Sequence, residues 1–436
     1  MMTLILRIPM IYKKIVMSNK IKVLLYACSF LFLICPVLGQ GLPETTPEQV
    51  GLSSVRLDRV GKAVNEYIES NNIAGAVTVV ARRGKIAHFK SYGLMDIESR
   101  KPMSNDAMFR IASMSKPITS TAIMILYEEG HFLLSDPVSK YIPEFANPKV
   151  IIPSSTPDSL ELEPAKTEIA IRHLLNHTSG ITYGAGLHSK LYNQAGIQSG
   201  LGPTEGTIGE MVNRLAKQPL ISNPGEEFHY GLSIDVLGYL VEVVSGTSLD
   251  EFLKQRIFVP LKMYDTHFVL PESKFSRLAR TYRRTIDGKL EREDVDLTYL
   301  LSQTYFSGGA GLVSTASDYM RFAQMILNKG ELDGVRILSR KTVELMTSNS
   351  IGDLYAAFRS NSGDKFGYGF GIRTERGQYD ELESLGIIGW DGAFYTRFWI
   401  DPEEQLIGIF MSQAQDNWNS SFVNKYRVLV YQAVND

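Results

Sequence analysis

The sequence contains very little cysteine. Of its 436 residues only two are cysteines, Cys28 and Cys35, and both lie in an apolar stretch near the N-terminus. Without that stretch the chain has no cysteine, which excludes disulfides, a thiolate nucleophile and cysteine-ligated zinc. Histidine is also scarce, with seven residues. The Gly-x-Ser-x-Gly motif of a nucleophile elbow is absent throughout, which excludes an α/β-hydrolase elbow.

The apolar stretch VLLYACSFLFLICPVLG (23–39) has the pattern of an export signal. Four lysines precede it, and the small residues Val37 and Gly39 stand where a signal peptidase would cut before Gln40. The stretch falls short of the length typical of a membrane span. We therefore expect residues 1–39 to be a cleaved signal rather than a retained anchor, and the protein to be periplasmic or secreted by a bacterium.

The charge balance argues against nucleic acid as a partner. The whole chain has 45 basic and 47 acidic side chains, and the first 39 residues hold five basic and no acidic ones. The remaining chain thus has 40 basic against 47 acidic groups, a net charge of −7. A negative balance also disfavours anionic membrane surfaces, so we expect a small-molecule substrate and no stable membrane span after signal removal.

Strand-like patterns lie near both ends of the chain, and helical patterns fill its middle. Residues 74–93 alternate as a hairpin, and residues 385–413 predict two or three strands. The simplest arrangement is an α/β (α+β) fold in which both ends form one antiparallel sheet flanked by helices. We predict one domain over 40–436, with the sheet region at about 50–115 and 300–436 and a helical insertion at about 131–300.

A Ser-x-x-Lys spacing begins the most suggestive segment, FRIASMSKPIT. A strand-like segment precedes Ser113, and a long apolar helix follows Lys116, where residues three apart share a face. An uncharged lysine could take the proton of the hydroxyl and so activate it. The same spacing recurs at Ser362 and Lys365 in a polar loop, so the motif alone also fits a capping serine beside a solvated lysine.

Two further segments could complete a reaction centre. Tyr230 follows a Pro-Gly turn and precedes an apolar helix, so its hydroxyl could relay a proton if it faced Lys116. In GWDGAFYTRFW, Gly392 would permit close approach of a ligand, and the backbone N–H of Ala393 could then donate to an oxyanion. Each segment alone also fits ordinary packing, as an aromatic core residue or a buried tryptophan beside a turn.

The Ser113-x-x-Lys116 pair, Tyr230 near mid-chain and the segment with Trp390 and Gly392 occur in this order along the chain. Together they resemble the motifs of the serine β-lactamase and penicillin-binding superfamily. The likeness is greatest to its class C branch and to the family VIII carboxylesterases, and it extends over roughly 50–430 through segments such as LLNHTSG and GGAGLVSTASDYMRFAQMILN. The resemblance implies that Ser113 forms an acyl-enzyme, that Lys116 is its base and that Tyr230 handles protons of the leaving group. It also implies an oxyanion hole from the N–H groups of Ser113 and Ala393, a β-lactamase/transpeptidase-like fold, and no cofactor or metal.

Two departures from the superfamily pattern bear on the substrate. Leu232 stands where an asparagine would bond a substrate amide, and Trp390 stands where a cation would attract a carboxylate. Both changes favour uncharged or apolar esters. Leu232, Trp390, Asp391 and Gly392 are therefore predicted to line the substrate site, with Asp391 either attracting a cationic substrate or bonding a nearby N–H.

The leading interpretation is thus a serine carboxylesterase. Its rival within the superfamily is a β-lactamase, D,D-carboxypeptidase or other D-amino-acid peptidase, and a different class is a non-catalytic penicillin-binding-like sensor. A metal enzyme is disfavoured, because His173 and His177 have the H-x-x-x-H spacing without the glutamate of a zinc protease motif. We interpret these histidines as packing and loop hydrogen-bonding residues.

Overall fold

The computed structural model describes residues 41–152, 160–184, 186–355, 364–375, 382–415 and 421–436. The predicted export signal over 1–39 lies outside these residues, as does Ser362, and the signal stays a prediction. All of the described residues belong to one compact unit. Within the described residues, no helix has both the length and the apolar character needed to cross a bilayer.

Eight strands of the described chain form one antiparallel sheet in the order β12-β13-β14-β15-β16-β1-β2-β3. They are β1 (Gly75–Arg82), β2 (Lys85–Asp96), β3 (Lys101–Pro102), β12 (Lys365–Phe366), β13 (Gly371–Ile372), β14 (Ile388–Gly392), β15 (Thr396–Asp401) and β16 (Leu406–Met411). Strand β1 pairs with β16, so the two ends of the chain meet in the middle of the sheet. The predicted sheet from both ends is therefore confirmed.

The other elements surround this sheet. The helices are α2 (Ser54–Glu69), α3 (Ser115–Glu128), α4 (Ile171–Leu175), α5 (Leu187–Gln194), α6 (Ile208–Leu215), α7 (Ser233–Ser245), α8 (Leu249–Leu253), α9 (Glu272–Phe275), α10 (Ala316–Leu327), α11 (Arg340–Met346) and α12 (Phe422–Tyr431), with short turns η1 (Pro47–Val50), η2 (Ala112–Met114), η3 (Val138–Lys140), η4 (Pro143–Phe145), η5 (Lys254–Phe258) and η6 (Leu297–Leu301). The smaller sheets pair β4 (Phe109–Arg110) with β9 (Val313–Ser314), β5 (Lys149–Ile152) with β6 (Glu161–Pro164), β10 (Glu331–Leu332) with β11 (Val335–Arg336), and β7 (Tyr282–Arg284) with β8 (Leu290–Arg292) and β17 (Ala414–Gln415).

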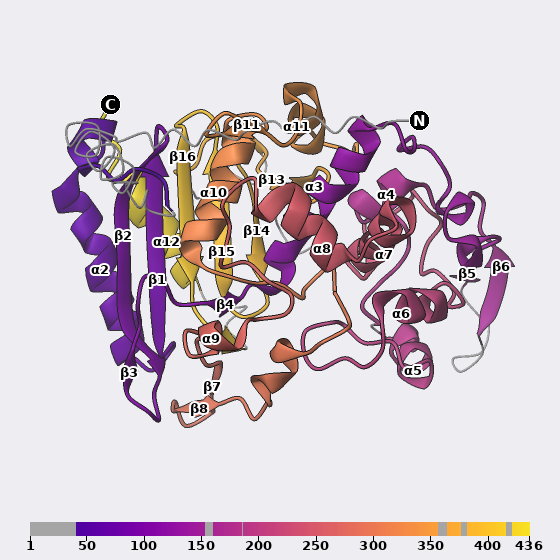
Figure 1. The fold of residues 1–436 in the computed structure, drawn as a ribbon, viewed down its shortest axis with the longest axis horizontal. Coiled ribbons are helices and arrows are strands. Elements are labelled where there is room, and N and C mark those ends of the chain that lie inside the picture. The colour runs from indigo at the N-terminus through magenta and orange to yellow at the C-terminus, as the bar shows by residue number, and fades with distance from the viewer. Residues whose placement is uncertain (1–40, 153–159, 185, 356–363, 376–381, 416–420) are drawn as a thin grey trace, which may run out of the picture. The chain divides into compact units, whose positions relative to one another are not determined.

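Helices cover both faces of the large sheet, which explains why every residue of β1 is buried. Ala76 and Val80 face the core that α2 and α12 close, whereas Val77 and Val79 face the larger core that includes α3 and α10. The helices α4 to α7 lie on the other side of α3 from the sheet, and α8 overlaps α3 in this view, as Figure 1 shows in magenta and rose. Helix α3, which carries Lys116, therefore stands between the sheet and this helical region.

Gly408 lies directly against the indole of Trp399 on the neighbouring strand. It lies opposite Trp399 in the β15–β16 register, and a Cβ added to Gly408 would lie 2.1 Å from the fully buried indole.

We expect Gly408→Ala to lower the free energy of unfolding by about 1–3 kcal/mol, because the indole must leave its packed position. A denaturant titration checks this. Gly202→Ala is the control, because its new Cβ meets nothing within 4 Å. Equal stability of Gly408→Ala and wild type would contradict the packing.

The sheet also contains a buried neutral histidine. His88 Nε2 lies 2.8 Å from Thr78 Oγ1, and desolvation lowers the pKa of His88 from 6.5 to about 4. The unfolded chain therefore binds a proton at a pH where the native protein does not. The stability that this site contributes is present above pH 6.5. As the pH falls toward 4, the free energy of unfolding decreases by on the order of 3 kcal/mol.

Thermal unfolding of wild type and His88→Gln across pH 4–8 checks this. The variant should lose less stability on acidification, and parallel curves would contradict the assignment.

Candidate active site

Ser113 lies in a sharp turn between a strand and a helix. The chain arrives through β4, which is held by β9, and Ala112 then adopts a φ of 43°, in the left-handed region that non-glycine residues avoid. Ser113 follows in η2, and α3 begins at Ser115. Sequence reasoning placed Ser113 at the helix N-terminus. The structure places it one short 3₁₀ turn earlier, where the strained backbone turns the chain from strand into helix.

Lys116 is a fully buried amine with three polar neighbours. Its Nζ lies 3.1 Å from Ser113 Oγ, 2.9 Å from the Tyr183 hydroxyl and 2.8 Å from the carbonyl oxygen of Gly309, to which it donates. The spacing of three on the helical turn thus brings the hydroxyl and the amine together. An amine in this position can accept the serine proton while the carbonyl and the phenol hold its orientation.

Tyr183 is a site residue that sequence reasoning missed. It follows the LLNHTSG segment, in a turn where Thr182 Oγ1 accepts a hydrogen bond from the N–H of Gly184. Desolvation raises the pKa of the partly buried Tyr183 well above its ordinary value, so the phenol stays neutral. The only available signal was its place in the glycine-rich region 181–206, which could not indicate contact with Lys116.

Tyr230 faces Lys116 with its ring rather than with its hydroxyl. Lys116 Nζ lies 4.7 Å from the ring centroid of Tyr230, and the Tyr230 hydroxyl accepts a hydrogen bond of 3.0 Å from Trp390 Nε1. The rings of Tyr183 and Tyr230 are 5.4 Å apart between centroids. Two phenols therefore lie beside the amine, one through its hydroxyl and the other through its aromatic face.

The predicted WDG segment forms the end of β14 next to the serine turn. Trp390 packs against Phe366, with ring centroids 5.0 Å apart. Asp391 forms an ion pair with its cross-strand neighbour Arg397. This contact corresponds to the predicted alternative of a bond to a nearby N–H, and it draws the carboxylate toward β15.

Gly392 packs directly against the chain before Ser113, since a Cβ added there would lie 2.4 Å from the Ile111 carbonyl oxygen. This approach brings Ala393 beside the serine turn, and the oxyanion role of the two N–H groups stays a prediction. Leu232 is buried at the N-terminal cap of α7, with 1 % of its surface exposed. Its contact with a substrate also stays a prediction.

Asp235 and Gly309 form a second group that the sequence analysis did not identify. Gly308 and Gly309 pass between α3 and α7, where the Gly308 carbonyl accepts a hydrogen bond from Thr119 Oγ1. A Cβ on Gly309 would lie 2.5 Å from Asp235 Oδ2 and 3.4 Å from Lys116 Nζ. The double glycine of the GGAGL segment was the available signal for this close approach.

The two histidines fill space and do not form a metal centre. His177 is fully buried among aromatic rings, with its ring centroid 4.7 Å from that of Tyr230, and burial lowers its pKa well below the ordinary value. His173 Nδ1 accepts a hydrogen bond from the N–H of Ala170. In the described part of the chain, no group of three or more His, Cys, Asp or Glu residues has the arrangement of a metal site.

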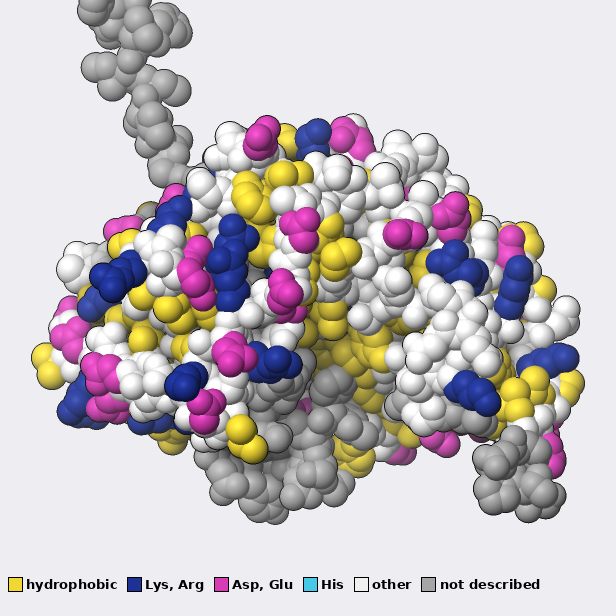
Figure 2. Space-filling model, turned by 90° about the horizontal axis from the view of Figure 1, so that it is seen from below, with side chains coloured by type: hydrophobic (Ala, Val, Ile, Leu, Met, Phe, Trp, Pro, Cys, Tyr) yellow, Lys and Arg dark blue, Asp and Glu magenta, His cyan; other side chains and the backbone are white. Residues whose placement is uncertain are grey.

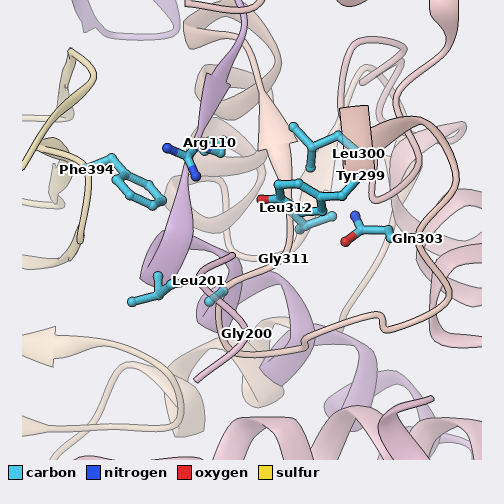
Figure 3. A pocket seen from close by; sticks show the side chains of 10 residues that line it. Arg110, Gly200, Leu201, Tyr299, Leu300, Gln303, Gly311, Leu312 and Phe394 are labelled. Carbon is cyan, nitrogen blue, oxygen red and sulfur yellow. The ribbon is translucent and has the colours of Figure 1, made fainter. Parts of the chain in front are cut away.

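A small cavity of about 10 Å³ lies next to the glycine segment and the turn after β14, large enough for about one water molecule. Figure 3 shows Arg110 and Phe394 on one side of it and Tyr299, Leu300 and Gln303 on the other. The Arg110 guanidinium lies 3.9 Å from the centre of the Phe394 ring and is paired with Glu293. This stack supports the turn that follows Ala393.

On the face seen in Figure 2, hydrophobic side chains gather in a central hollow, with charged side chains to either side.

Comparisons with known proteins agree with this geometry. The beta-lactamase family model matches residues 60–432. The chain belongs to the beta-lactamase family. Protein Rv1367c of Mycobacterium tuberculosis is 33 % identical over 372 residues, which cover 82 % of this chain and 90 % of the relative. Esterase EstB of Burkholderia gladioli is 29 % identical over 373 residues, covering 80 % and 87 %.

A solved structure, that of EstCE1, described as a hydrolase with promiscuous acyltransferase activity, also aligns well. It matches with a TM-score of 0.76 and 26 % identity over 86 % of this chain and 99 % of that one. These matches confirm the predicted superfamily and fold, and they identify the protein as a serine hydrolase of the beta-lactamase family.

The contact between Lys116 and Ser113 predicts how the serine reacts. We expect Lys116→Met to slow phosphonylation of Ser113 by a fluorophosphonate by at least about 100-fold, because the variant lacks the amine that accepts the proton. Intact-mass measurement over time checks this.

Lys365→Met is a matched control. Lys365 has the same Ser-x-x-Lys spacing, but its amine donates to the Leu354 carbonyl and lies 3.8 Å from the centre of the Tyr355 ring. The Lys365→Met variant should react with the fluorophosphonate at the wild-type rate. Labelling of Lys116→Met as fast as wild type would show that the amine does not activate the serine.

Proposed function

We propose that this protein is a carboxylesterase that cleaves small uncharged or apolar esters through an acyl-enzyme on Ser113. The observation that carries the proposal is the 3.1 Å contact between Ser113 Oγ and the buried amine of Lys116. A hydroxyl is a poor nucleophile until a neighbouring base takes its proton, and this amine is held in place for that step. The esterase EstB and the hydrolase EstCE1 among the similar proteins support the same reaction class.

The site supports the following sequence of steps. Ser113 Oγ attacks the ester carbonyl while its proton moves to Lys116. The N–H groups of Ser113 and Ala393 stabilise the oxyanion that develops on the carbonyl oxygen. The proton then moves to the leaving alcohol, with Tyr183 and Tyr230 as the phenols beside the amine. Water attacks the acyl-enzyme in the second half, with the same groups acting in reverse.

The neighbours of the reacting groups favour esters over amides and carboxylates. Trp390 supplies an indole where a cation would attract a substrate carboxylate, and this indole donates to Tyr230. Leu232 cannot form the hydrogen bond that a substrate amide would require. The partly exposed rings of Tyr230 and Trp390 form an aromatic wall beside the amine, and the buried rings of Phe366 and His177 pack behind it. An apolar acyl or alcohol group fits this wall better than a charged one does.

Acyl transfer to an alcohol is a second candidate function. It uses the same acyl-enzyme, but an organic alcohol replaces water as the acceptor. The aromatic wall favours an apolar acceptor over water, and EstCE1 is described as having promiscuous acyltransferase activity. Adding 1-butanol to an ester assay should give a butyl ester, detectable by mass spectrometry, if acyl transfer competes with hydrolysis. Exclusive formation of the free acid would contradict this second candidate.

The main proposal is tested by hydrolysis of short-chain p-nitrophenyl esters. We expect Ser113→Ala to lower kcat/KM by at least about 1000-fold, because the nucleophile is lost. Ser120→Ala is the matched control. Ser120 is buried in α3, the helix that follows Ser113, and its hydroxyl has no hydrogen-bond partner among the described residues. Undiminished turnover by Ser113→Ala would end the proposal.

The rival activities are separated by parallel substrates. Faster turnover of nitrocefin or of a D-Ala-D-Ala peptide than of every ester would identify a β-lactamase or D-amino-acid peptidase instead. A wild-type protein that hydrolyses none of these substrates, and that no fluorophosphonate labels, would be a non-catalytic sensor.

A further inference from the structure

A buried carboxylate lies behind the proposed base. Asp235 is in the first turn of α7 and has no exposed surface. Its Oδ1 accepts a hydrogen bond of 2.6 Å from Ser307 Oγ. Its Oδ2 lies against Gly309, close enough that a side chain on Gly309 would collide with it. Neither the predicted catalytic set nor the predicted substrate contacts include this residue.

Asp235 and Lys116 share Gly309 as a common neighbour. Lys116 donates to the Gly309 carbonyl oxygen over 2.8 Å, and Asp235 binds the same turn through Ser307. Glycine is needed between them, because a Cβ would lie 2.5 Å from Asp235 Oδ2 and 3.4 Å from Lys116 Nζ. The carboxylate therefore helps to fix the carbonyl that orients the amine toward Ser113.

Among the described groups that face Lys116, Asp235 is the one that can bring a negative charge at neutral pH. The others are the Ser113 hydroxyl from η2, Tyr183 and His177 from the segment after α4, and Tyr230 from the segment before α7. Burial keeps Tyr183 and His177 neutral, because it raises the pKa of the phenol and lowers that of the imidazole.

The ionisation of Asp235 itself reflects opposing effects. Desolvation raises the pKa of Asp235 above its ordinary value, whereas the hydrogen bond from Ser307 and the charge of Lys116 oppose this increase. When ionised, the carboxylate favours the protonated form of an amine nearby. A base must lose that proton before it can accept one from a serine.

We propose that Asp235 is a positioning residue that holds the Gly309 carbonyl toward Lys116 and, through its charge, sets the pH range in which the amine is free to accept the Ser113 proton. This inference rests on the proposed function, because it assigns a role in activating the same serine. Asp235 acts through Lys116 and Gly309 and does not touch the substrate.

The test measures phosphonylation of Ser113 by a fluorophosphonate as a function of pH, in wild type, Asp235→Asn and Asp235→Ala. Asparagine keeps the shape and an acceptor for Ser307 but removes the charge. We expect the acid limb of the rate for Asp235→Asn to move to lower pH by at least about half a unit, because the free amine persists at lower pH without the neighbouring anion. Asp235→Ala also removes the acceptor for Ser307 and so frees the turn that contains Gly309. This variant should lower the maximal rate of labelling about 10-fold or more, while the fluorophosphonate concentration that gives half of the maximal rate stays unchanged.

Glu242→Gln is the matched control in the same helix. Glu242 is partly buried and binds the N–H of Leu249, but it does not contact the Lys116 turn. Its profile should coincide with that of wild type. A profile of Asp235→Asn that coincides with wild type or moves to higher pH would overturn the inference, as would an unchanged maximal rate in Asp235→Ala. Absence of labelling in wild type would instead overturn the proposed function, so the two failures are distinguishable.

Discussion

A lysine amine that is removed from water needs polar partners, and the candidate active site is built around that requirement. Lys116 has no exposed surface, and an amine buried without hydrogen bonds would be costly to the fold. Three segments meet this need: the serine turn, the segment with Tyr183, and the glycine segment that contributes the Gly309 carbonyl. The contacts that make the burial tolerable are the same ones that direct the amine at the serine.

Close approach of backbone to backbone makes this arrangement possible. The glycine segment passes between α3 and α7, and Gly392 lies against the Ile111 carbonyl, so neither place has room for a side chain. Around these contacts several groups are aromatic, and the indole of Trp390 donates a hydrogen bond to the Tyr230 hydroxyl. Small residues bring the reacting groups together, and large aromatic residues surround them.

Much of the fold was predictable because its patterns are local. The hairpin over 74–93, the helix after Ser113 and the strands over 385–413 correspond to β1 and β2, to α3 and to β14 to β16. Ser113 and Lys116 were predictable for the same reason, since their contact depends on spacing within one turn. Ordered motifs along the chain then indicated the superfamily, which the family match over 60–432 confirms.

Contacts between distant segments could not be read from the sequence. Tyr183 lies 67 residues from Lys116, and nothing in its own segment indicates which of the two tyrosines would present its hydroxyl. Asp235 resembles any acidic residue in the first turn of a helix, and its burial beside Gly309 depends on how α7 packs against α3. The orientation of Tyr230 likewise depends on Trp390, which belongs to a strand far along the chain.

The pairing of β1 with β16 has a consequence for biosynthesis. Val77 and Met411 are partners in the register, so the central strands of the sheet cannot join until the chain up to residue 411 has left the ribosome. Ser113 and Lys116, the proposed nucleophile and base, are made early, whereas Trp390 and the strands beside it come much later in the chain. A nascent chain thus carries Ser113 and Lys116 without their later neighbours, and the proposed catalytic centre is complete only after those neighbours have been made.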